Sequence, residues 1–450
     1  MFIDFLVDRL SSHPDADAIV WEGRRFSCGD MAARVAHWRA DIERRQVAPG
    51  SVVAVEGDFS PNSIALVLAL TERPCIVVPH SNVSRKGRDR KDTIAQIEYY
   101  YRVDDADTVT FESTGCSADH ELYAKIRAAR HPGLILFSSG TSGDPKAAVH
   151  DFVYLLDKYR VQRRGMITLN FLLFDHWGGL NTFLHTLSNG GTTVTVRDRS
   201  PDAVCRLVQD FRVQLLPATP TFLNLLLLSG VFKNYDLSSI ELITYGAEPM
   251  PQSTLDRLAR VFPQIKLQQT YGLIELGVLR SKSRENGSLW VKIGGEGFQT
   301  RVVDGVLQIK SASTILGYLN APAPITPDGW FITGDAVEQD GEYFRILGRK
   351  SEIINVGGEK VYPVEVESVI QAMPNVAEVT VYGEKNPLLG NIVCAKVRLR
   401  ESQEPQQFID ALKQFCYGRL ERYKVPVKVA VLDQQHFGDR FKKARAEIGR

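Results

Sequence analysis

The chain has 450 residues, of which 44% are hydrophobic and 24% charged, and its formal net charge is +1 at pH 7. This length exceeds the size at which one hydrophobic core stops growing, so at least two domains are expected. A near-neutral charge argues against a nucleic-acid-binding surface as the main role of the protein.

The first segment, MFIDFLVDRLSSHPDADAI, places Asp4 and Asp8 inside its apolar run. It therefore predicts an amphipathic helix rather than a signal peptide. The most apolar stretch, TFLNLLLLSGVF at 221–232, is too short to cross a bilayer. The six cysteines are scattered without a CxxC pair, which is typical of free thiols in a reducing compartment. We expect no transmembrane segment and a cytoplasmic location.

Strand-like and helix-like segments alternate over most of the chain. SVVAVEG precedes the helical PNSIALVLALTE and then PCIVVPH, and TTVTV precedes the helical PDAVCRLVQDF and then VQLLPAT. This rhythm predicts parallel sheets covered by helices. From about residue 290 short strands and turns replace this alternation of strands and helices. A compact α+β pattern then continues to the C-terminus. We place the domain boundary in GRKSE, which gives an N-terminal domain of residues 1–349 and a C-terminal domain of residues 350–450.

The loop FSSGTSGDPKAAVHD, residues 137–151, has the composition of a polyanion site. Its glycines expose backbone N–H groups, and Lys146 adds a positive charge. It is not a Walker A loop, because Gly140 and Gly143 are three residues apart and KAAVHD reads as a strand rather than the start of a helix. A Ser/Gly-rich turn without a ligand is the alternative interpretation.

Three later segments carry groups that suit a nucleotide. TYGAEPM is a small-residue turn that allows close backbone approach to a flat ring. QTYGLIELG supplies an aromatic ring and the carboxylate of Glu275, which suits Mg²⁺. GWFITGD and LGR place Asp335 and Arg349 near expected strand ends, where they can bind ribose hydroxyls and a phosphate or ribose oxygen. The structural alternatives are a solvated acid for Glu275, a turn former for Asp335 and a surface ion pair for Arg349.

Taken in order, these segments, NVGGEKVYPVEVE and a lysine near the C-terminus resemble the adenylate-forming superfamily. That group comprises acyl-CoA synthetases, adenylation domains of peptide synthetases and luciferases. The resemblance covers essentially the whole chain. It implies an α/β fold, with a large N-terminal domain of parallel-rich sheets with helices plus a distorted β-barrel, and a small mobile α+β C-terminal lid. It also implies that ATP activates a carboxylic acid as an acyl adenylate, which a pantetheine thiol then attacks with release of AMP.

The resemblance also implies roles for individual residues. Positive charge is needed where two anions meet, and it implies Lys442 as the catalytic lysine there. Thr141 and Glu275 are implied to place Mg²⁺, Ser351 to act as the hinge, and Gly357 and Gly358 to form the thiol tunnel. The implied ATP-binding residues are Ser138, Ser139, Gly140, Thr141, Ser142, Gly143 and Lys146 for the phosphates, Gly246, Ala247, Glu248, Tyr271 and Gly272 for adenine, and Asp335 with Arg349 for the ribose.

Three positions depart from the family pattern. Ile274 stands where threonine usually precedes the acid, and Ser351 stands where the hinge usually has Asp or Lys. In FKKAR, Phe441 replaces the glycine before Lys442, and Lys443 competes for the same role. None of these changes removes a charge that adenylation needs, so we retain the enzyme interpretation. A catalytically inactive nucleotide-binding homologue is the alternative class.

The stretch NFLLFDHWGGLNTFL is where the resemblance implies the substrate pocket, with Asp175, His176 and Gly178 as its residues. Acyl-CoA synthetases tend to have Phe-His here and amino-acid-activating domains Phe-Asp, and this sequence fits both. HWGGLNTFL continues in the acyl-CoA manner, so we favour a fatty, aryl or similar non-amino acid. His176 is then a pocket wall and Asp175 a helix-start or structural acid.

Two alternatives stay open. One is a stand-alone amino-acid-adenylating enzyme that loads a carrier protein, with Asp175 pairing with the substrate amine. The other concerns the acceptor, because coenzyme A and the phosphopantetheine of an acyl carrier protein share the same thiol arm.

Overall fold

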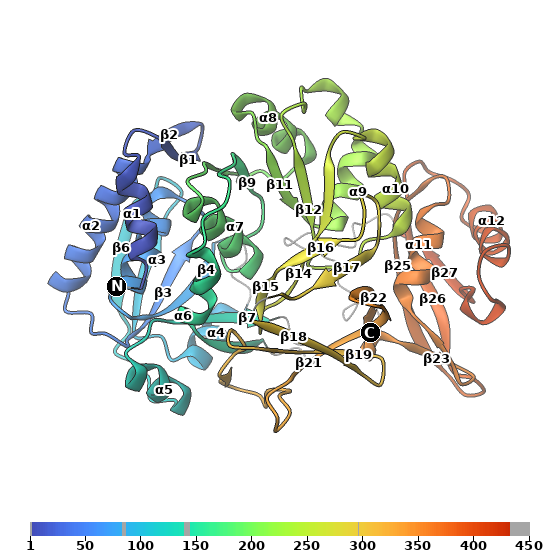
Figure 1. The fold of residues 1–450 in the computed structure, drawn as a ribbon. Helices are drawn as coiled ribbons and strands as arrows, with labels where there is room; N and C mark the ends of the chain where they lie inside the picture. The colour runs from blue at the N-terminus through green and yellow to red at the C-terminus, as the bar shows by residue number, and fades with distance from the viewer. Residues whose placement is uncertain (1, 83–86, 139–144, 296, 433–450) are drawn as a thin grey trace.

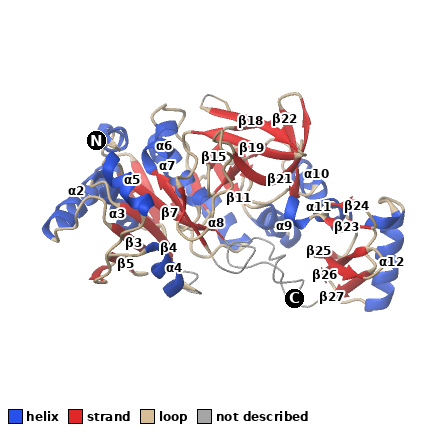
Figure 2. Ribbon diagram, turned by 90° about the horizontal axis from the view of Figure 1, so that it is seen from below, coloured by secondary structure: helices blue, strands red, loops and turns tan. Residues whose placement is uncertain are grey.

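The computed structural model describes residues 2–82, 87–138, 145–295 and 297–432. Most of the chain forms a large body, and the C-terminal part forms a smaller one packed at the side opposite the N-terminus (Figures 1 and 2). This is the predicted fold class. Within the described ranges, the search for a helix long and apolar enough to span a bilayer finds no candidate.

A mostly parallel sheet of seven strands forms one layer of the large body. Its strands, in spatial order, are β13 (Lys266–Gln269), β12 (Leu242–Tyr245), β11 (Leu215–Ala218), β9 (Thr168–Asn170), β10 (Thr193–Thr195), β1 (Asp17–Trp21) and β2 (Arg24–Ser27). All neighbours are parallel except the hairpin of β1 and β2. The carboxyl ends of β11, β12 and β13 therefore lie at the same edge, where α/β sheets bind ligands.

A second sheet of seven strands forms the next layer. Its order is β20 (Gly317–Tyr318), β8 (Lys146–Asp151), β7 (Gly133–Ser138), β4 (Ile76–Ser81), β3 (Val52–Gly57), β5 (Tyr99–Val103) and β6 (Val109–Ser113). The central strands β7, β4, β3 and β5 are parallel, while β8, β20 and β6 are antiparallel additions. Because β8 is a strand antiparallel to β7, the Ser/Gly-rich loop joins two strands, as KAAVHD predicts.

The helices of the large body are α1 (Asp4–Ser12), α2 (Cys28–Arg44), α3 (Pro61–Glu72), α4 (Arg88–Ala95), α5 (Glu121–Ala129), α6 (Phe152–Leu156), α7 (Trp177–Ser188), α8 (Pro201–Phe211), α9 (Pro220–Ser229) and α10 (Gln252–Val261), with 3₁₀ turns η1 (Asp157–Tyr159) and η2 (Val231–Asn234). Several begin with a hydroxyl side chain followed by proline. Ser60, Ser200 and Thr219 cap α3, α8 and α9, and a proline follows each. The hydroxyl accepts an unpaired backbone N–H, and proline needs no donor at the first helical position.

A six-stranded antiparallel sheet forms the half-barrel of the large body. Its order is β16 (Ser281–Ser283), β17 (Trp290–Ile293), β22 (Tyr343–Arg349), β21 (Phe331–Asp340), β19 (Val306–Ser311) and β18 (Phe298–Val303). A short hairpin, β14 (Tyr271–Leu273) with β15 (Gly277–Leu279), lies between it and the parallel sheets (Figure 1). This hairpin contains the YGLIELG segment, so the segment lies where the three sheets meet.

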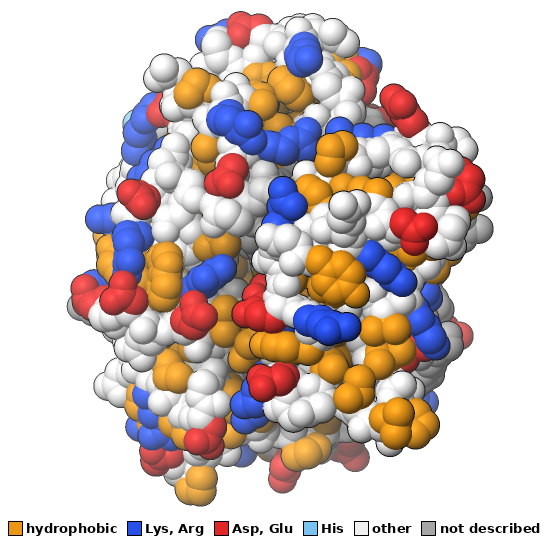
Figure 3. Space-filling view, turned by 90° about the vertical axis from the view of Figure 1, so that its right-hand side faces the viewer, with side chains coloured by type: hydrophobic (Ala, Val, Ile, Leu, Met, Phe, Trp, Pro, Cys, Tyr) orange, Lys and Arg blue, Asp and Glu red, His pale blue; other side chains and the backbone are white. Residues whose placement is uncertain are grey.

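The small C-terminal body, which we call the lid, has its own core. It contains β24 (Glu359–Val361), β23 (Ile354–Val356), β26 (Gly390–Leu399), β25 (Val376–Asn386) and β27 (Lys428–Val431), with α11 (Pro363–Gln371), α12 (Pro405–Tyr417) and the turns η3 (Lys350–Glu352) and η4 (Arg422–Lys424). Lys and Arg side chains and Asp and Glu side chains are scattered among hydrophobic and other surface on this side of the molecule (Figure 3). The boundary between residues 349 and 350 stays a prediction.

Hydrogen bonds to backbone carbonyls join the lid to the large body. Asn224 Nδ2 in α9 donates to the Ala377 carbonyl at 3.2 Å, and Ser253 Oγ in α10 donates to the Ser368 carbonyl at 3.4 Å. These contacts place α11 and β25 against α9 and α10.

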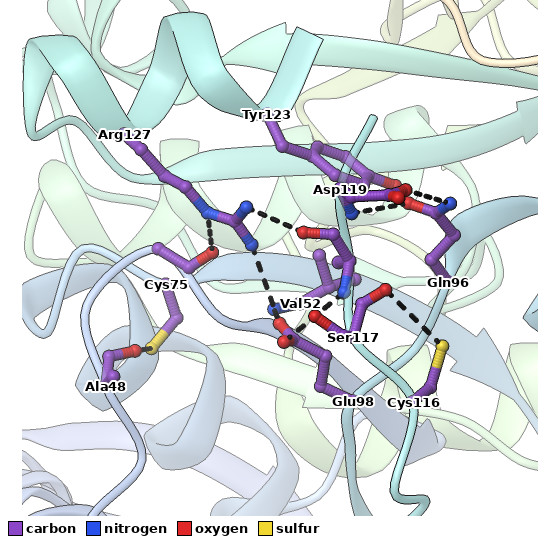
Figure 4. A network of polar contacts seen from close by, with 12 residues as sticks. Ala48, Val52, Cys75, Gln96, Glu98, Cys116, Ser117, Asp119, Tyr123 and Arg127 are labelled. Atoms are coloured by element: carbon purple, nitrogen blue, oxygen red, sulfur yellow. Dashed lines mark hydrogen bonds and ion pairs between the residues drawn. The ribbon is translucent and has the colours of Figure 1, made fainter. Parts of the chain in front are cut away.

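A polar network around Glu98 ties the second sheet to α5 (Figure 4). Glu98 accepts a hydrogen bond from the Val52 backbone N–H at 2.8 Å and lies 3.7 Å from the Arg127 guanidinium. Arg127 also donates to the Ala118 carbonyl at 2.7 Å. These groups satisfy one another's hydrogen-bonding capacity, and they belong to the second sheet rather than to the one that contains β11–β13. We therefore assign them a structural role.

Candidate active site

A cavity of about 230 Å³ lies at the carboxyl ends of β11, β12 and β13, between the half-barrel and the lid. It brings together side chains and turns that are distant in sequence. The six residues predicted to bind the nucleoside that line this cavity are Ala247, Glu248, Tyr271, Gly272, Asp335 and Arg349. A turn that can lie against a flat base on one side and a carboxylate that can bind ribose hydroxyls on the other suit a nucleoside.

The turn after β12 leaves no room for a side chain at its first position, and its second position has an uncommon backbone conformation. A Cβ atom at Gly246 would lie 2.4 Å from Thr270 Oγ1 and 2.7 Å from the Thr270 carbonyl oxygen. Ala247 has φ +70°, in the left-handed region that a side chain disfavours. Glu248 accepts a hydrogen bond from the Thr221 backbone N–H at 2.7 Å, which fixes the turn to the start of α9.

Asp335 is held at the cavity wall by a tyrosine and an arginine. Its Oδ2 accepts from the Tyr271 hydroxyl at 2.6 Å, and its Oδ1 lies 3.1 Å from Arg349 Nε. Burial raises the pKa of the Asp335 carboxyl, and Arg349 opposes that shift. Arg349 also donates to the Thr333 carbonyl at 2.5 Å, and its side chain is 45% exposed. Arg349 therefore has exposed surface for a ligand while it holds Asp335.

One expectation about these two residues is wrong. Asp335 was expected near a strand end, but it lies in the middle of β21, directly opposite Arg349 at the end of β22. A β-bulge follows it, between Ala336 and Val337, and Gly334 has φ +76°. The glycine in ITGD therefore marks an irregular point within a long strand rather than the strand's end.

Glu275 lies beside Tyr318, which in turn lies next to Lys146 at the end of the Ser/Gly-rich loop. Its Oε1 accepts from the Tyr318 hydroxyl at 2.5 Å, and the Lys146 ammonium lies 5.5 Å from the centroid of the Tyr318 ring. Burial raises the pKa of Tyr318, and the neighbouring Glu275 adds to the shift. Sequence reasoning missed Tyr318, because it lies 43 residues from Glu275 and its short strand has no distinctive pattern.

The loop itself is only partly described. Ser138 ends β7 and pairs with Lys146 at the start of β8, so the two strands bring the ends of the loop together. The predicted phosphate-binding residues Ser139, Gly140, Thr141, Ser142 and Gly143 lie outside the described residues.

The residues predicted for the acyl pocket lie at the start of α7. His176 is the N-cap, and its Nδ1 accepts from the Gly178 backbone N–H at 3.0 Å. The helix-start role proposed for Asp175 is therefore wrong, since the next residue fills it. Asp175 is buried, and a Cβ at Gly178 would lie 2.5 Å from Leu172 Cδ1. None of the three lines the 230 Å³ cavity.

A histidine near this helix was also missed. His150 in β8 is buried, and its Nε2 lies 2.8 Å from the Ile274 carbonyl oxygen. Burial lowers the pKa of His150 to about 4, so this imidazole is neutral at pH 7. Its ring stacks on Trp177 with centroids 6.3 Å apart. The hydrogen bond to the Ile274 carbonyl fixes the backbone directly before Glu275.

The lid residues singled out in the sequence occupy different places. Ser351 lies exposed in η3, between the half-barrel and the lid. Gly357 and Gly358 form the turn of the hairpin β23–β24, with φ +58° and +95°, and do not line the cavity. Lys442 lies outside the described residues, as does Lys443.

Polar lid side chains line the cavity, which the sequence did not predict. Gln371 of α11 and Glu378 and Thr380 of β25 lie along its wall. Thr380 Oγ1 is buried, and no described residue hydrogen-bonds to it. No local signal marks these residues, because they reach the cavity only when the lid packs against α9 and α10.

Comparisons with known proteins assign the chain to a family. The sequence model of AMP-binding enzymes matches residues 74–304, which is more than half of the chain, and the model of the AMP-binding enzyme C-terminal domain matches residues 365–436. The chain is an AMP-binding enzyme of the adenylate-forming superfamily. The resemblance inferred from its motifs is confirmed.

Relatives of this AMP-binding enzyme include ligases of several acids. An indoleacetate–CoA ligase of Aromatoleum aromaticum is 27% identical, with 94% of this chain and 92% of the relative aligned. A long-chain-fatty-acid–CoA ligase of Mycobacterium tuberculosis is 30% identical over 66% of this chain and 63% of its own. An anthranilate CoA ligase structure in complex with anthranoyl-AMP superposes with a TM-score of 0.85 at 17% identity, covering 99% of this chain and 96% of that one. At that identity the superposition shows the shared fold.

Proposed function

We propose that this enzyme uses ATP to activate a non-amino carboxylic acid as an acyl adenylate and then forms a thioester with release of AMP. One observation carries the proposal. In a chain of this family, one cavity is lined by both the turn at Ala247 and the Asp335–Arg349 pair. The hairpin β14–β15 also lines this cavity and continues to Glu275, which contacts Tyr318 beside Lys146.

We assign one part of ATP to each wall of the cavity. The turn at Ala247 and Glu248 and the Tyr271 strand accommodate the adenine, and the Asp335 carboxylate accepts hydrogen bonds from the ribose hydroxyls. Hydrogen bonds to a charged group are the strong ones, and Arg349 and Tyr271 keep this carboxylate in place before ATP arrives. The triphosphate then extends towards Lys146.

The first half-reaction joins two anions. A carboxylate oxygen of the acid forms a bond to the α-phosphorus, and the bond to the β-phosphate breaks as pyrophosphate leaves. In the second half-reaction the thiol sulfur attacks the acyl carbon, loses its proton, and AMP leaves. Lys146 and Lys442 supply positive charge in the first step, and their contribution grows as charge develops in the transition state.

The residues near Lys146 fit a magnesium ion. Mg²⁺ prefers oxygen ligands and commonly takes one or two carboxylates together with substrate phosphates. Glu275 supplies one carboxylate, held by Tyr318, and ATP supplies the phosphates. Bound there, Mg²⁺ would neutralise phosphate charge. No cluster of three or more metal-ligating side chains occurs in the described ranges, which agrees with a site completed by the nucleotide.

The thiol and the setting also belong to this proposal. Coenzyme A is the favoured acceptor, because the relatives aligned over most of this chain are named CoA ligases or, in one case, a feruloyl-CoA synthase. A separate acyl carrier protein is the alternative acceptor. All six cysteines are free thiols, which supports a reducing compartment, and we propose the cytoplasm.

A panel of carboxylic acids tests the proposal. Purified enzyme is mixed with ATP, Mg²⁺ and each acid, and acyl adenylate is trapped with hydroxylamine while pyrophosphate is measured. We expect hydroxamate with at least one non-amino acid, and a large loss of rate in Glu275→Gln. The exposed Glu342, which pairs with Lys292, gives the matched control Glu342→Gln. A preference for α-amino acids would favour the amino-acid alternative, and no hydroxamate with any acid would favour an inactive homologue.

A further inference from the structure

A lysine that the proposed chemistry does not use points inward beside α7. Lys158 lies in η1, and its ammonium donates to Asn181 Oδ1 at 2.6 Å and to the Val278 carbonyl at 2.8 Å. It also lies 4.8 Å from the ring centroid of Tyr159 and 5.8 Å from that of Trp177. Its hydrogen-bonding partners are neutral groups.

Lys158 has no anionic partner among the residues that the structure describes. Burial lowers the pKa of Lys158 to about 7, and the positive charges of Arg163 and Arg280 add to the shift. A partly buried cation normally has an anionic partner, because desolvating an unpaired charge is costly. The Lys158 ammonium therefore lacks the negative charge that would normally accompany it.

The helix beside this lysine carries a polar stripe along one face. Trp177, Asn181 and His185 are spaced four residues apart on α7, so they lie on the same side of the helix. The other positions of this helix include Leu180, Phe183, Leu184 and Leu187, which are buried in the core. Trp177 is 2% exposed, and its indole N–H finds no hydrogen-bond acceptor in the described ranges. A buried donor without a partner is a second, independent sign of a missing acceptor.

This group lies close to the proposed reaction centre. Val278, which accepts from Lys158, is three residues after Glu275. Three residues of extended chain span at most about 10 Å. A Cβ at Gly277, between them, would lie 2.9 Å from Trp177 Nε1. The N-terminal end of α7, where the acyl pocket is predicted, adjoins the same hairpin.

We propose that Lys158, together with the Trp177 indole N–H, binds a second anionic group on the acid, so that the substrate is a dicarboxylic acid. The proposal rests on the proposed function, since it names the class of acid that this enzyme activates. One carboxylate reacts near Glu275, and the other lies beside the Lys158 ammonium, which donates to the carbonyl of Val278 in the same hairpin. The second carboxylate accepts hydrogen bonds from the charged Lys158 and supplies the anionic partner that this lysine lacks.

A series of matched acids tests this assignment. Straight-chain dicarboxylic acids of three to eight carbons are each compared with their monomethyl esters, which keep the length and remove the second charge. We expect hydroxamate formation with the preferred diacid to exceed that with its ester by roughly 10- to 100-fold in kcat/KM, the range for a hydrogen bond to a charged group. Lys158→Met should reduce this ratio to about threefold or less, while Lys158→Arg keeps it above that value. Trp177→Phe should lower it partially.

Controls separate this inference from the proposed function. Lys292→Met removes an exposed lysine that pairs with Glu342 and should leave the ratio unchanged. Calorimetric titration of each variant with the diacid alone reports binding without turnover, and melting curves report folding. Equal kcat/KM for diacid and ester in the wild-type enzyme would overturn the inference even if the enzyme is active. If no acid is turned over, the proposed function fails, and diacid binding that is lost in Lys158→Met would still support the site.

Discussion

Asp335 combines a buried carboxylate with two partners that oppose the effect of burial. Burial raises its pKa, whereas Arg349 and the Tyr271 hydroxyl stabilise the charged form. Such a carboxylate accepts hydrogen bonds strongly and cannot turn away from the cavity. The same two partners make it intolerant of substitution, because its loss leaves the buried Tyr271 hydroxyl without its acceptor.

We expect Asp335→Asn to lower kcat/KM for ATP by about 10- to 100-fold, because the charged acceptor for the ribose hydroxyls becomes neutral. The same change should affect 2′-deoxy-ATP less, since that substrate lacks one of the hydroxyls. Steady-state kinetics with both nucleotides measure the ratio. Asp340→Asn, in the same strand but in an exposed pair with Arg284, is the control. An equal loss with both nucleotides would show that Asp335 does not bind the ribose.

Lys158 predicts a dependence on pH. Its pKa of about 7 lies below the usual range, so the free enzyme loses the positive charge as pH rises through 7. The diacid-to-ester ratio in kcat/KM should therefore be highest below pH 7 and fall about tenfold per pH unit well above it.

The groups that face Lys158 do not titrate in that range. His185 on α7 has a pKa lowered to about 4 by burial and by nearby cations, and burial raises the pKa of Tyr159 well above 10. Lys158→Arg should abolish the alkaline decrease, because a guanidinium stays protonated. A ratio that stays flat from pH 6 to pH 9 in the wild-type enzyme would contradict the assigned role.

At the scale of elements, local sequence determined the helices well. The predicted segments PNSIALVLALTE and PDAVCRLVQDF coincide with α3 and α8 to the residue. Each begins with a hydroxyl cap and a proline, which set the boundary through backbone hydrogen bonding alone. Of the two roles predicted for Asp175, helix start or structural acid, the structure gives the helix start to His176, which is not among the preferred capping residues.

The hairpin β23–β24 supports a prediction that separates the two half-reactions. Gly358 has φ +95°, and a Cβ there would meet no atom within 4 Å. A side chain is therefore accommodated in the present lid position, at the cost of local strain. If the hairpin turns towards the thiol in the second half-reaction, Gly358→Leu should slow thioester formation from a supplied acyl adenylate by at least tenfold while sparing adenylation.

Gly341 provides the control for that experiment. It lies in the turn of the hairpin β21–β22 with φ +59°, and its Cβ would also meet open space. Gly341→Leu should therefore show the cost of strain in a tight turn without affecting the thiol step. If both variants slow both half-reactions equally, the hairpin of the lid has no special role in thiol transfer.

For the whole molecule, the position of the lid decides which groups meet at the cavity. Here α11 and β25 contribute Gln371, Glu378 and Thr380 to its wall, whereas Gly357 and Gly358 lie away from it. The family resemblance implies a second position in which the hairpin faces the site. That the lid changes position in this enzyme stays a prediction.

Lys442 tests the two positions. We expect Lys442→Ala to slow adenylation by about 10²- to 10³-fold, as the loss of one charge-stabilising group typically does. Thioester formation from a supplied acyl adenylate should survive, because the lysine has left the site. Lys443→Ala is the control and should be mild in both assays. An essential Lys443 with a dispensable Lys442 would shift the assignment by one residue, and an equal loss in both half-reactions would contradict two lid positions.

The sequence by itself determined the family, the order of its motifs and the bounds of two helices, and the roles that it predicts for nucleotide-binding residues stay predictions. These depend on local properties, such as the glycines of a turn, the periodicity of a helix and the charge of a side chain. Tertiary structure alone decided which groups act on one another. Tyr318 meets Glu275 across 43 residues, and Lys158 meets Val278 across 120. The energy of a charge depends on burial and on its neighbours in space, and strand register and packing of the core set both.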